Sequence, residues 1–128
     1  MKALTIYQPY AHLIAIKEKV IENRTWYHGY RGPIAIHAGN SKEYMKKFGG
    51  TYGFAFKGMR YGCVIAIAEI YLWEELDKLP IELRCHYHAE GPWCIALRNI
   101  RRIRPIPARG MQRLWEWKEP RGSEIVYL

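Results

Sequence analysis

The sequence is poor in cysteine and has no long hydrophobic run, and these two shortages exclude several classes of protein. Its three cysteines, Cys63, Cys85 and Cys94, form no C-x-x-C pair, which favours free thiols in a reducing compartment over a disulfide framework. The longest uninterrupted apolar run, residues 63–68, is far too short to cross a bilayer. The first residues lack the anatomy of a secretory signal. We therefore expect a cytoplasmic protein without a membrane partner.

Several motifs of nucleotide, metal and hydrolase chemistry are also missing. The chain has no G-x-x-x-x-G-K-[ST] phosphate loop and no G-x-G-x-x-G fingerprint. No Ser-His-Asp arrangement can be argued from the spacing. Cys85, His86 and His88 lie close together, but no second cluster of ligands follows at zinc-finger spacing. We therefore predict no metal and no cofactor.

Acidic residues are scarce as well, and one segment has none. The 128 residues carry a formal net charge of +8, and a chain of this length predicts one domain over residues 1–128. An excess of positive charge favours polyanionic partners. Residues 98–113 hold six arginines and no acid, and arginine suits bidentate contacts to phosphate. If Arg98, Arg102 and Arg104 share an outward strand face, they form a binding stripe; the alternative is a charged strand edge that blocks sheet-to-sheet pairing.

The hydrophobic pattern predicts several short strands and two or three short helices. We expect strands at 20–26, 34–38, 63–73, 93–103 and 124–128, helices at 11–17, 42–48 and 74–79, a helical turn at 111–117, and a loop rich in glycine and aromatics at 49–60 that contains Lys57. Strand 63–73 is apolar on both faces, which fits a closed barrel better than an open sheet. The pattern predicts an α+β domain built around a small barrel.

The clearest candidate site is Lys19, Glu22 and Arg24, a K-x-x-E-x-R spacing at the end of a helical stretch. On a strand, Glu22 and Arg24 share a face, and Lys19 can lean toward the same side. A carboxylate beside arginine stays ionised, and a lysine in a dry cleft can act as a base or a nucleophile. The alternative is a surface salt bridge with little energetic value.

Glu69 is a second candidate because it interrupts an otherwise apolar strand. A lone carboxylate on such a face needs a partner or stays protonated. Glu69 is therefore either a catalytic residue or half of a structural ion pair, with Arg24 or with an arginine of 98–104 as its partner.

Aromatic residues flank the charged motif and can form the wall of a cleft. Tyr7, Tyr10, Trp26 and Tyr30 are the best placed for stacking on unpaired bases, although barrel packing is the alternative for most aromatics. His37 points to the face opposite its neighbours Ile34 and Ile36. It either reaches the cleft or ends the strand with a hydrogen bond.

Several segments resemble the ASCH domain family, and together they cover nearly the whole chain. They are Gln8-Pro9, the Lys19/Glu22/Arg24 spacing, R-G-P-I-A-I-H-A at 31–38, G-C-V-I-A-I-A-E at 62–69, and residues 105–115. The family signature is written G-x-K-x-x-E-x-R, and here Lys17 occupies the glycine position. The resemblance implies a small PUA-like β-barrel with helices over its ends and a cleft lined by the signature.

The resemblance implies binding of RNA or of a nucleotide. The candidate nucleic-acid-binding residues are Gln8, Tyr10, Lys19, Arg24, Trp26, His37, Arg98, Arg101, Arg102, Arg104 and Arg109. The alternative is a hydrolase, either a ribonuclease or an enzyme acting on an N4-acylated cytidine nucleoside. Lys19 would then be the base or nucleophile, with Glu22 or Glu69 moving the proton.

One departure bears on the hydrolase alternative. In the amide-hydrolysing members of the family, a threonine stands where this chain has Glu22, and a further acid follows later in the sequence. Glu69, Glu82 and Glu90 compete for that later position.

Overall fold

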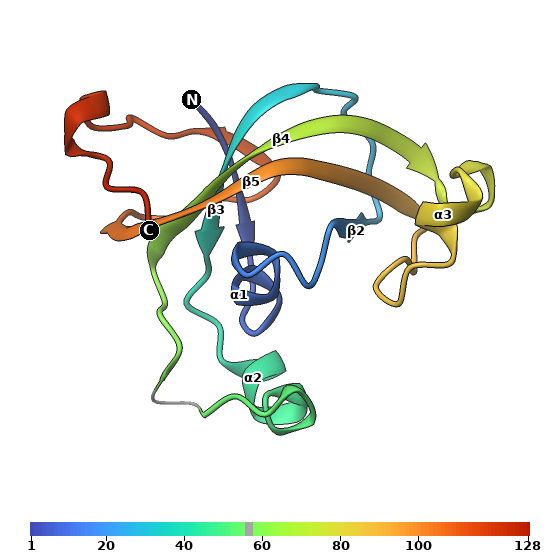
Figure 1. Cartoon of the computed structure of the whole chain (residues 1–128), viewed down its shortest axis with the longest axis horizontal. Coiled ribbons are helices and arrows are strands. Elements are labelled where there is room, and N and C mark those ends of the chain that lie inside the picture. The colour runs from blue at the N-terminus through green and yellow to red at the C-terminus, as the bar shows by residue number, and fades with distance from the viewer. Residues whose placement is uncertain (56–57) are drawn as a thin grey trace.

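A computed structural model describes residues 1–55 and 58–128. A curled six-stranded sheet forms its frame, with the order β2-β5-β4-β3-β1-β6 (Figure 1). The strands are β1 (Lys2–Ile6), β2 (Ile21–Arg24), β3 (Gly32–Ala38), β4 (Cys63–Glu75), β5 (Trp93–Pro107) and β6 (Leu114–Glu116). Neighbouring strands are antiparallel, except that β1 and β3 run parallel.

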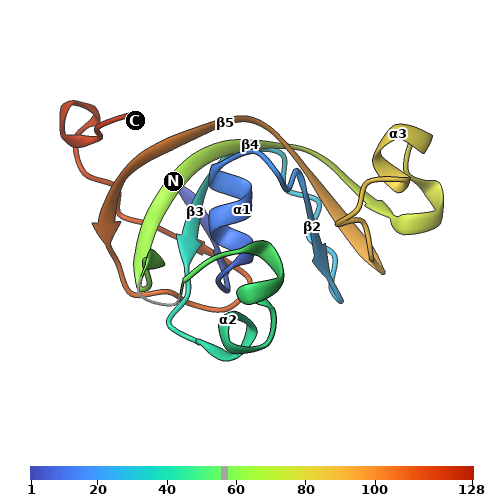
Figure 2. The same cartoon turned by 60° about the horizontal axis from the view of Figure 1, so that its bottom comes forward.

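The sheet wraps around one helix instead of closing completely. No pairing joins the outer strands β2 and β6 within the described residues, so the sheet is a half-barrel (Figure 2). The α-helices in the described part of the chain are α1 (Tyr10–Ala15), α2 (Glu43–Phe48) and α3 (Ile81–Arg84). This architecture confirms the predicted small α+β fold. None of the helices in 1–55 and 58–128 is long and apolar enough to span a membrane.

Both faces of the central strands are covered, which explains the apolar run in β4. On the concave face, Ala11 and Ile14 of α1 pack into a core with Ile36 and Ile70 (Figure 2). A second cluster on the opposite face contains Ala3, Ala35, Val64, Ile103, Trp115 and Trp117. The segment after β5 therefore covers the face that α1 leaves open.

Helix α1 ends in a turn that requires a left-handed residue, and Lys17 fills this position with φ of 68°. The backbone N–H of Lys17 donates to the Ile14 carbonyl at 2.9 Å, and that of Glu18 donates to the Leu13 carbonyl at 2.9 Å. These two bonds form the Schellman motif, in which glycine is the usual left-handed residue. The signature's glycine position is thus a helix C-cap, and the turn forms with lysine in place of glycine.

Three predicted elements near the chain's C-terminal half are wrong or displaced. Residues 111–117 form no helical turn; Leu114–Glu116 is strand β6, paired with β1. The strand predicted at 124–128 is reduced to a single bridge between Ile103 and Tyr127, after a short 3-10 helix at Gly122–Glu124. In the segment 74–79, β4 continues to Glu75 and only Leu76–Lys78 is helical.

Two further boundaries differ from the prediction. Strand β5 runs on through Pro105 to Pro107, in a region where its register with β4 shifts. In the loop predicted at 49–60, Gly50–Tyr52 forms a 3-10 helix. Residues 56 and 57 of that loop, including Lys57, lie outside the described residues.

Candidate functional site

The three charged signature residues form one buried ionic cluster. Lys19 Nζ lies 3.3 Å from Glu22 Oε1, and Arg24 Nη1 lies 2.9 Å from Glu22 Oε2. The Lys19 side chain is 3% exposed and that of Glu22 is 7% exposed, so this is not the surface salt bridge of the alternative interpretation. Removing one partner from a buried cluster leaves an uncompensated charge, so the three residues act as a unit.

Strand pairing and the end of α1 hold the cluster in place. The left-handed turn at Lys17 directs the chain from α1 toward β2, where Glu22 pairs with Ile95 and Arg24 with Trp93 of β5. Arg24 Nη2 also donates to the Thr5 carbonyl at 3.0 Å. Arg24 therefore ties the sheet's outer strand β2 to the end of β1, across the open side of the half-barrel.

Asn23 fixes a distant loop against the same strand. Its Nδ2 donates to the His88 carbonyl at 2.8 Å, and its Oδ1 accepts from the backbone N–H groups of Glu90 at 2.9 Å and Gly91 at 2.8 Å. The side chain of Asn23, which lies between Glu22 and Arg24, thus makes three hydrogen bonds to backbone groups of this loop. As a result, the loop that follows α3 is held beside Lys19 and Glu22.

A pocket of about 320 Å³ opens over the cluster, at the lower end of the ~300–1,000 Å³ typical of small-molecule sites. We call it the tyrosine pocket, and it is lined by Ile6, Tyr7, Tyr10, Lys19, Glu22, Asn23, Arg24, Tyr44, Tyr52, Tyr87, His88 and Glu90. Its rings form a connected set: Tyr44 lies 5.8 Å from both Tyr7 and Tyr10, and Tyr52 lies 6.3 Å from Tyr10 and 6.0 Å from His88. Lys19 Nζ lies 5.6 Å from the Tyr10 ring centre.

Burial acts on the pKa values of Glu22, Tyr10 and His88 in the tyrosine pocket. Burial favours the neutral carboxyl of Glu22, but Arg24 and Lys19 outweigh it and lower the pKa of Glu22 below its usual value. Burial, with a contribution from Tyr52, raises the pKa of Tyr10 to about 12. Burial, together with Lys19, lowers the pKa of His88 to about 4. At neutral pH, therefore, Glu22 is ionised while Tyr10 and His88 are uncharged.

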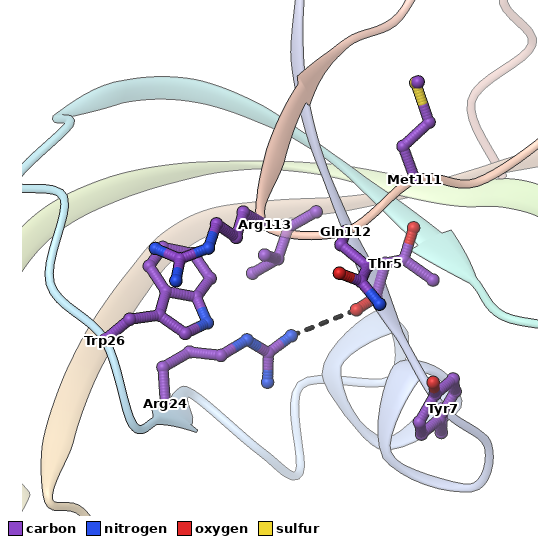
Figure 3. A pocket seen from close by; sticks show the side chains of 8 residues that line it. Thr5, Tyr7, Arg24, Trp26, Met111, Gln112 and Arg113 are labelled. Carbon is purple, nitrogen blue, oxygen red and sulfur yellow. Dashed lines mark hydrogen bonds between the residues drawn. The ribbon is translucent and has the colours of Figure 1, made fainter.

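A second pocket of about 350 Å³ adjoins the first and is drawn in Figure 3. We call it the arginine pocket, and it is lined by Leu4, Thr5, Tyr7, Arg24, Trp26, Met111, Gln112 and Arg113. Tyr7 and Arg24 line both pockets. The guanidinium of Arg113 lies over Trp26, 5.3 Å from the ring centre. Among the described residues, no carboxylate lines this second pocket.

The sequence and the fold of this chain are similar to those of known proteins. A family model for the ASCH domain matches residues 4–122. The chain belongs to the ASCH domain family. The solved structure of ASCH from Zymomonas mobilis is similar to this domain with 15% identity and a TM-score of 0.50, covering 83% of this chain and 72% of that one. A single-substitution variant of that protein gives 15% identity, 83% and 74% coverage, and a TM-score of 0.49. At this identity the likeness shows the fold alone. A search of the curated proteins finds no match.

Within this ASCH domain, two predicted binding residues are occupied by internal hydrogen bonds. Gln8 is buried; its Nε2 donates to the Arg60 carbonyl at 2.8 Å, and its Oε1 accepts from the His12 N–H at 2.9 Å. His37 is also buried, with Nε2 2.7 Å from the Ala108 carbonyl and Nδ1 3.2 Å from Thr5 Oγ1. A carbonyl can only accept, so Nε2 carries the proton. Neither residue lines the tyrosine or the arginine pocket.

Glu69 lies outside both pockets and forms an ion pair with Arg98. Its Oε2 accepts from Arg98 Nε at 2.7 Å and from Asn99 Nδ2 at 3.0 Å. The Arg98 hydrogen bond is the main cause of the lowered pKa of Glu69. This geometry matches the structural ion pair that the sequence left open. Of the three acids considered for the later position, Glu90 is the one that lines the tyrosine pocket.

The arginines of β5 are divided between surfaces instead of forming one stripe. The register between β4 and β5 shifts at Asn99, whose backbone is left-handed with φ of 53°. On the two sides of this shift, Arg98 pairs with Glu69 and Arg101 pairs with Ile67. Because positions 67 and 69 share a face of β4, the extra residue puts Arg98 and Arg101 on the same side. Arg101 stacks 3.6 Å from the Tyr127 ring centre. Arg102 lies in a separate hollow beside Gln8 and His12.

Arg104 and Arg109 are exposed, and none of the arginines from 98 to 109 lines the tyrosine or the arginine pocket. Of the cleft-wall tyrosines expected from the sequence, Tyr30 also lies elsewhere; its hydroxyl donates to the Pro33 carbonyl at 2.7 Å. Tyr10 and Trp26 do line the pockets, as expected.

The sequence reasoning missed the pocket residues that come from distant segments. They are Tyr44 on α2, and Tyr87 and His88 after α3. One signal was available: Tyr44 and Phe48 stand four apart on a short helix, which aligns two aromatic rings on one face. Arg113 belongs to the arginine-rich run at 98–113, but its place in the arginine pocket depends on the pairing of β6 with β1.

Proposed function

We propose that this protein binds single-stranded RNA and holds one unpaired base in the tyrosine pocket. The observation that carries the proposal is the set of aromatic side chains that lines one pocket with two cations, buried Lys19 and partly buried Arg24, both held by Glu22. Aromatic faces stack on any base, and RNA-binding domains use them to hold bases that are not paired. Membership of the ASCH family supports RNA as the ligand.

The rim of the pocket favours an extended strand over an isolated base. Tyr7, Tyr44 and Phe48 form a ladder of nearly parallel rings, with 22° between the first two planes and 18° between the last two. Each of the three side chains is exposed. Such a row of half-open rings offers platforms for successive bases outside the pocket.

Within the pocket, Lys19 and Arg24 supply donors and Glu22 orients them. The Lys19 ammonium carries three N–H groups, and Glu22 is its ion-pair partner among the described residues. The remaining donors face a pocket lined by uncharged rings. Donors in this position suit the carbonyl oxygens and ring nitrogens of a base edge. Because Glu22 fixes both cations, the donors are ordered before the ligand arrives.

Binding of a fluorescent ten-nucleotide RNA of mixed sequence tests the proposal, with fluorescence anisotropy as the readout. Tyr44→Leu should weaken binding about tenfold or more, since stacking contributes ~1–3 kcal/mol per base. Tyr27→Leu is the matched control, because Tyr27 is an exposed tyrosine that lines neither pocket. Equal affinity in both variants would remove the tyrosine pocket from RNA binding. A DNA strand of the same sequence measures the preference for RNA.

One observation also favours a hydrolase as a second candidate: Glu90 joins Lys19 and Glu22 in the same pocket. We propose for this case that Lys19 acts as base or nucleophile, with Glu22 or Glu90 moving the proton. The substrates to try are the N4-acylated nucleoside N4-acetylcytidine, which would yield cytidine and acetate, and a short RNA. Mass spectrometry after incubation should show product that disappears in Lys19→Ala. If neither substrate is cleaved, the hydrolase proposal is wrong and RNA binding remains the proposed function.

We also propose that the protein acts in the cytoplasm. The three cysteines are free, and Cys63 and Cys94 are buried. Free thiols are typical of reducing compartments. Fractionation of cells that express the full chain tests this proposal directly.

A further inference from the structure

We propose that the arginine pocket binds the phosphate that adjoins the base in the tyrosine pocket, so that the recognised unit is a nucleotide and not a nucleoside. This inference rests on the proposed function and deepens it. The two pockets differ in formal charge and share two lining residues. They also contain arginine N–H groups that donate no hydrogen bond to any described residue.

The two pockets differ in formal charge, and this difference indicates that they bind different parts of a ligand. In the tyrosine pocket, the cations Lys19 and Arg24 face the acids Glu22 and Glu90, and the lining is balanced. The arginine pocket is lined by Arg24 and Arg113, and no acid lines it among the described residues. A balanced pocket with aromatic walls suits an uncharged base, whereas a pocket with two guanidinium groups suits an anion.

Arg113 is held in place without being neutralised. Its guanidinium lies over the Trp26 ring (Figure 3), and it forms no salt bridge within the described part of the chain. The contact with the ring orients the cation but leaves its charge available. Its backbone is fixed as well: Leu114, the next residue, pairs with Leu4 of β1, and Arg113 itself is left-handed with φ of 60°. A left-handed backbone at a residue other than glycine is unfavourable, so the fold holds Arg113 in this position.

Arg24 offers further donors on the same side. Its Nη1 donates to Glu22 and to the Asn23 carbonyl, and its Nη2 donates once, to the Thr5 carbonyl. A guanidinium has five N–H groups, so the second Nη2 hydrogen and the Nε hydrogen have no partner among the described residues. Phosphate accepts hydrogen bonds from arginine in pairs. Arg24 and Arg113 together therefore provide an ordered anion site.

The two pockets adjoin at a common wall that a nucleotide can cross. Tyr7 and Arg24 line both of them, and the Tyr7 side chain is exposed. Arg24 reaches Glu22 in the tyrosine pocket with one nitrogen and the Thr5 carbonyl beside the arginine pocket with the other (Figure 3). A base and its phosphate are attached at different carbons of the ribose, so two adjoining pockets with a shared residue can hold one each.

The salt dependence of binding tests this inference, using the same ten-nucleotide RNA. Arg113→Gln removes the charge and leaves a shorter, polar side chain. Arg121→Gln is the matched control, because Arg121 is exposed and lines neither pocket. Loss of one phosphate contact should reduce the slope of log affinity against log salt by about 0.7. We expect that reduction, with an affinity loss of about tenfold at low salt, in Arg113→Gln only.

Small probes provide a second readout that does not need a long RNA. The four ribonucleosides and their monophosphates are titrated while the Trp26 indole N–H resonance is followed, assigned with Trp26→Phe. Each monophosphate that binds should bind more tightly than its nucleoside, and this advantage should vanish in Arg113→Gln. Equal affinities of nucleoside and monophosphate for the unsubstituted protein would overturn the inference.

The outcomes separate this inference from the proposed function. RNA binding that depends on Tyr44 but has the same salt slope in Arg113→Gln and Arg121→Gln overturns the phosphate site alone. A slope that falls in Arg113→Gln while Tyr44→Leu binds normally supports the phosphate site and overturns the base pocket. Absence of RNA binding by the unsubstituted protein overturns both.

Discussion

Arg24 donates a 2.9 Å hydrogen bond to Glu22, and it lines both pockets while Glu22 lines only one. The carboxylate also lies 3.3 Å from Lys19, so a single buried acid positions every cation of the signature. The signature thereby sets the geometry of the proposed base site and of the proposed phosphate site together. Loss of Glu22 should accordingly affect folding and ligand binding together.

Replacement of Glu22 by Gln should lower the free energy of unfolding by about 3 kcal/mol at pH 7, because buried Lys19 and partly buried Arg24 lose their counter-charge. Urea denaturation measures this change. Glu43→Gln is the matched control: its ion pair with Lys47 is exposed, and such pairs contribute ~0–1 kcal/mol. A similar small effect in both variants would show that the buried cluster does not stabilise the fold.

The stabilisation from Glu22 should disappear in acid. The pKa of Glu22 is lowered in the folded protein from an ordinary value of 4.5, so its contribution is fully present above pH 4.5 and is lost as the pH falls through the folded-state pKa. The difference in unfolding free energy between the unsubstituted protein and Glu22→Gln should therefore shrink below pH 4.5. A difference that stays constant from pH 7 to strong acid would contradict the ionised, paired carboxylate.

Replacement of Lys17 by Gly should stabilise the protein by about 1 kcal/mol, because the left-handed turn after α1 disfavours every residue with a Cβ. Thermal or urea unfolding measures the gain. Lys46→Gly provides the opposite control: Lys46 lies inside helix α2, where glycine should destabilise by about 1 kcal/mol. If Lys17→Gly also destabilises the protein, the turn does not limit stability.

His88 should titrate with a midpoint near pH 4 in the folded protein, because burial and Lys19 lower its pKa to about 4. The imidazole resonances report this midpoint by NMR, and His88→Gln identifies them. In the unfolded chain, histidine takes up its proton near pH 6.5, so His88 should reduce stability as the pH falls from about 6.5 to 4. A midpoint near 6.5 would show that the side chain is open to solvent and away from Lys19.

The local features of the sequence predicted the centre of the site, and distant contacts determined the rest. Glu22 and Arg24 stand two apart in an extended segment, so their common face follows from strand geometry. Tyr44 and Glu90 reach the same pocket from α2 and from the loop after α3. The loop's position depends on the hydrogen bonds that Asn23 makes across the fold, and no local pattern reveals them.

Two errors had identifiable physical causes. The expected arginine stripe assumed strict alternation along β5, but the shift at Asn99 places Arg98 and Arg101 on one side. The sequence predicted a helical turn at 111–117, whereas Trp115 and Trp117 are buried on either side of exposed Glu116. This alternation is typical of a strand, and it was already readable in the sequence.

Cross-linking of a short RNA that carries 4-thiouridine tests the central claim most directly. After irradiation, digestion and mass spectrometry identify the peptides that are joined to RNA. Stacking in the tyrosine pocket predicts adducts within residues 42–52 and 85–90, which contain Tyr44, Tyr52 and Tyr87, and their loss in Tyr44→Leu. Adducts confined to the exposed arginines of β5, residues 98–104, would contradict the claim and place the RNA on the other surface.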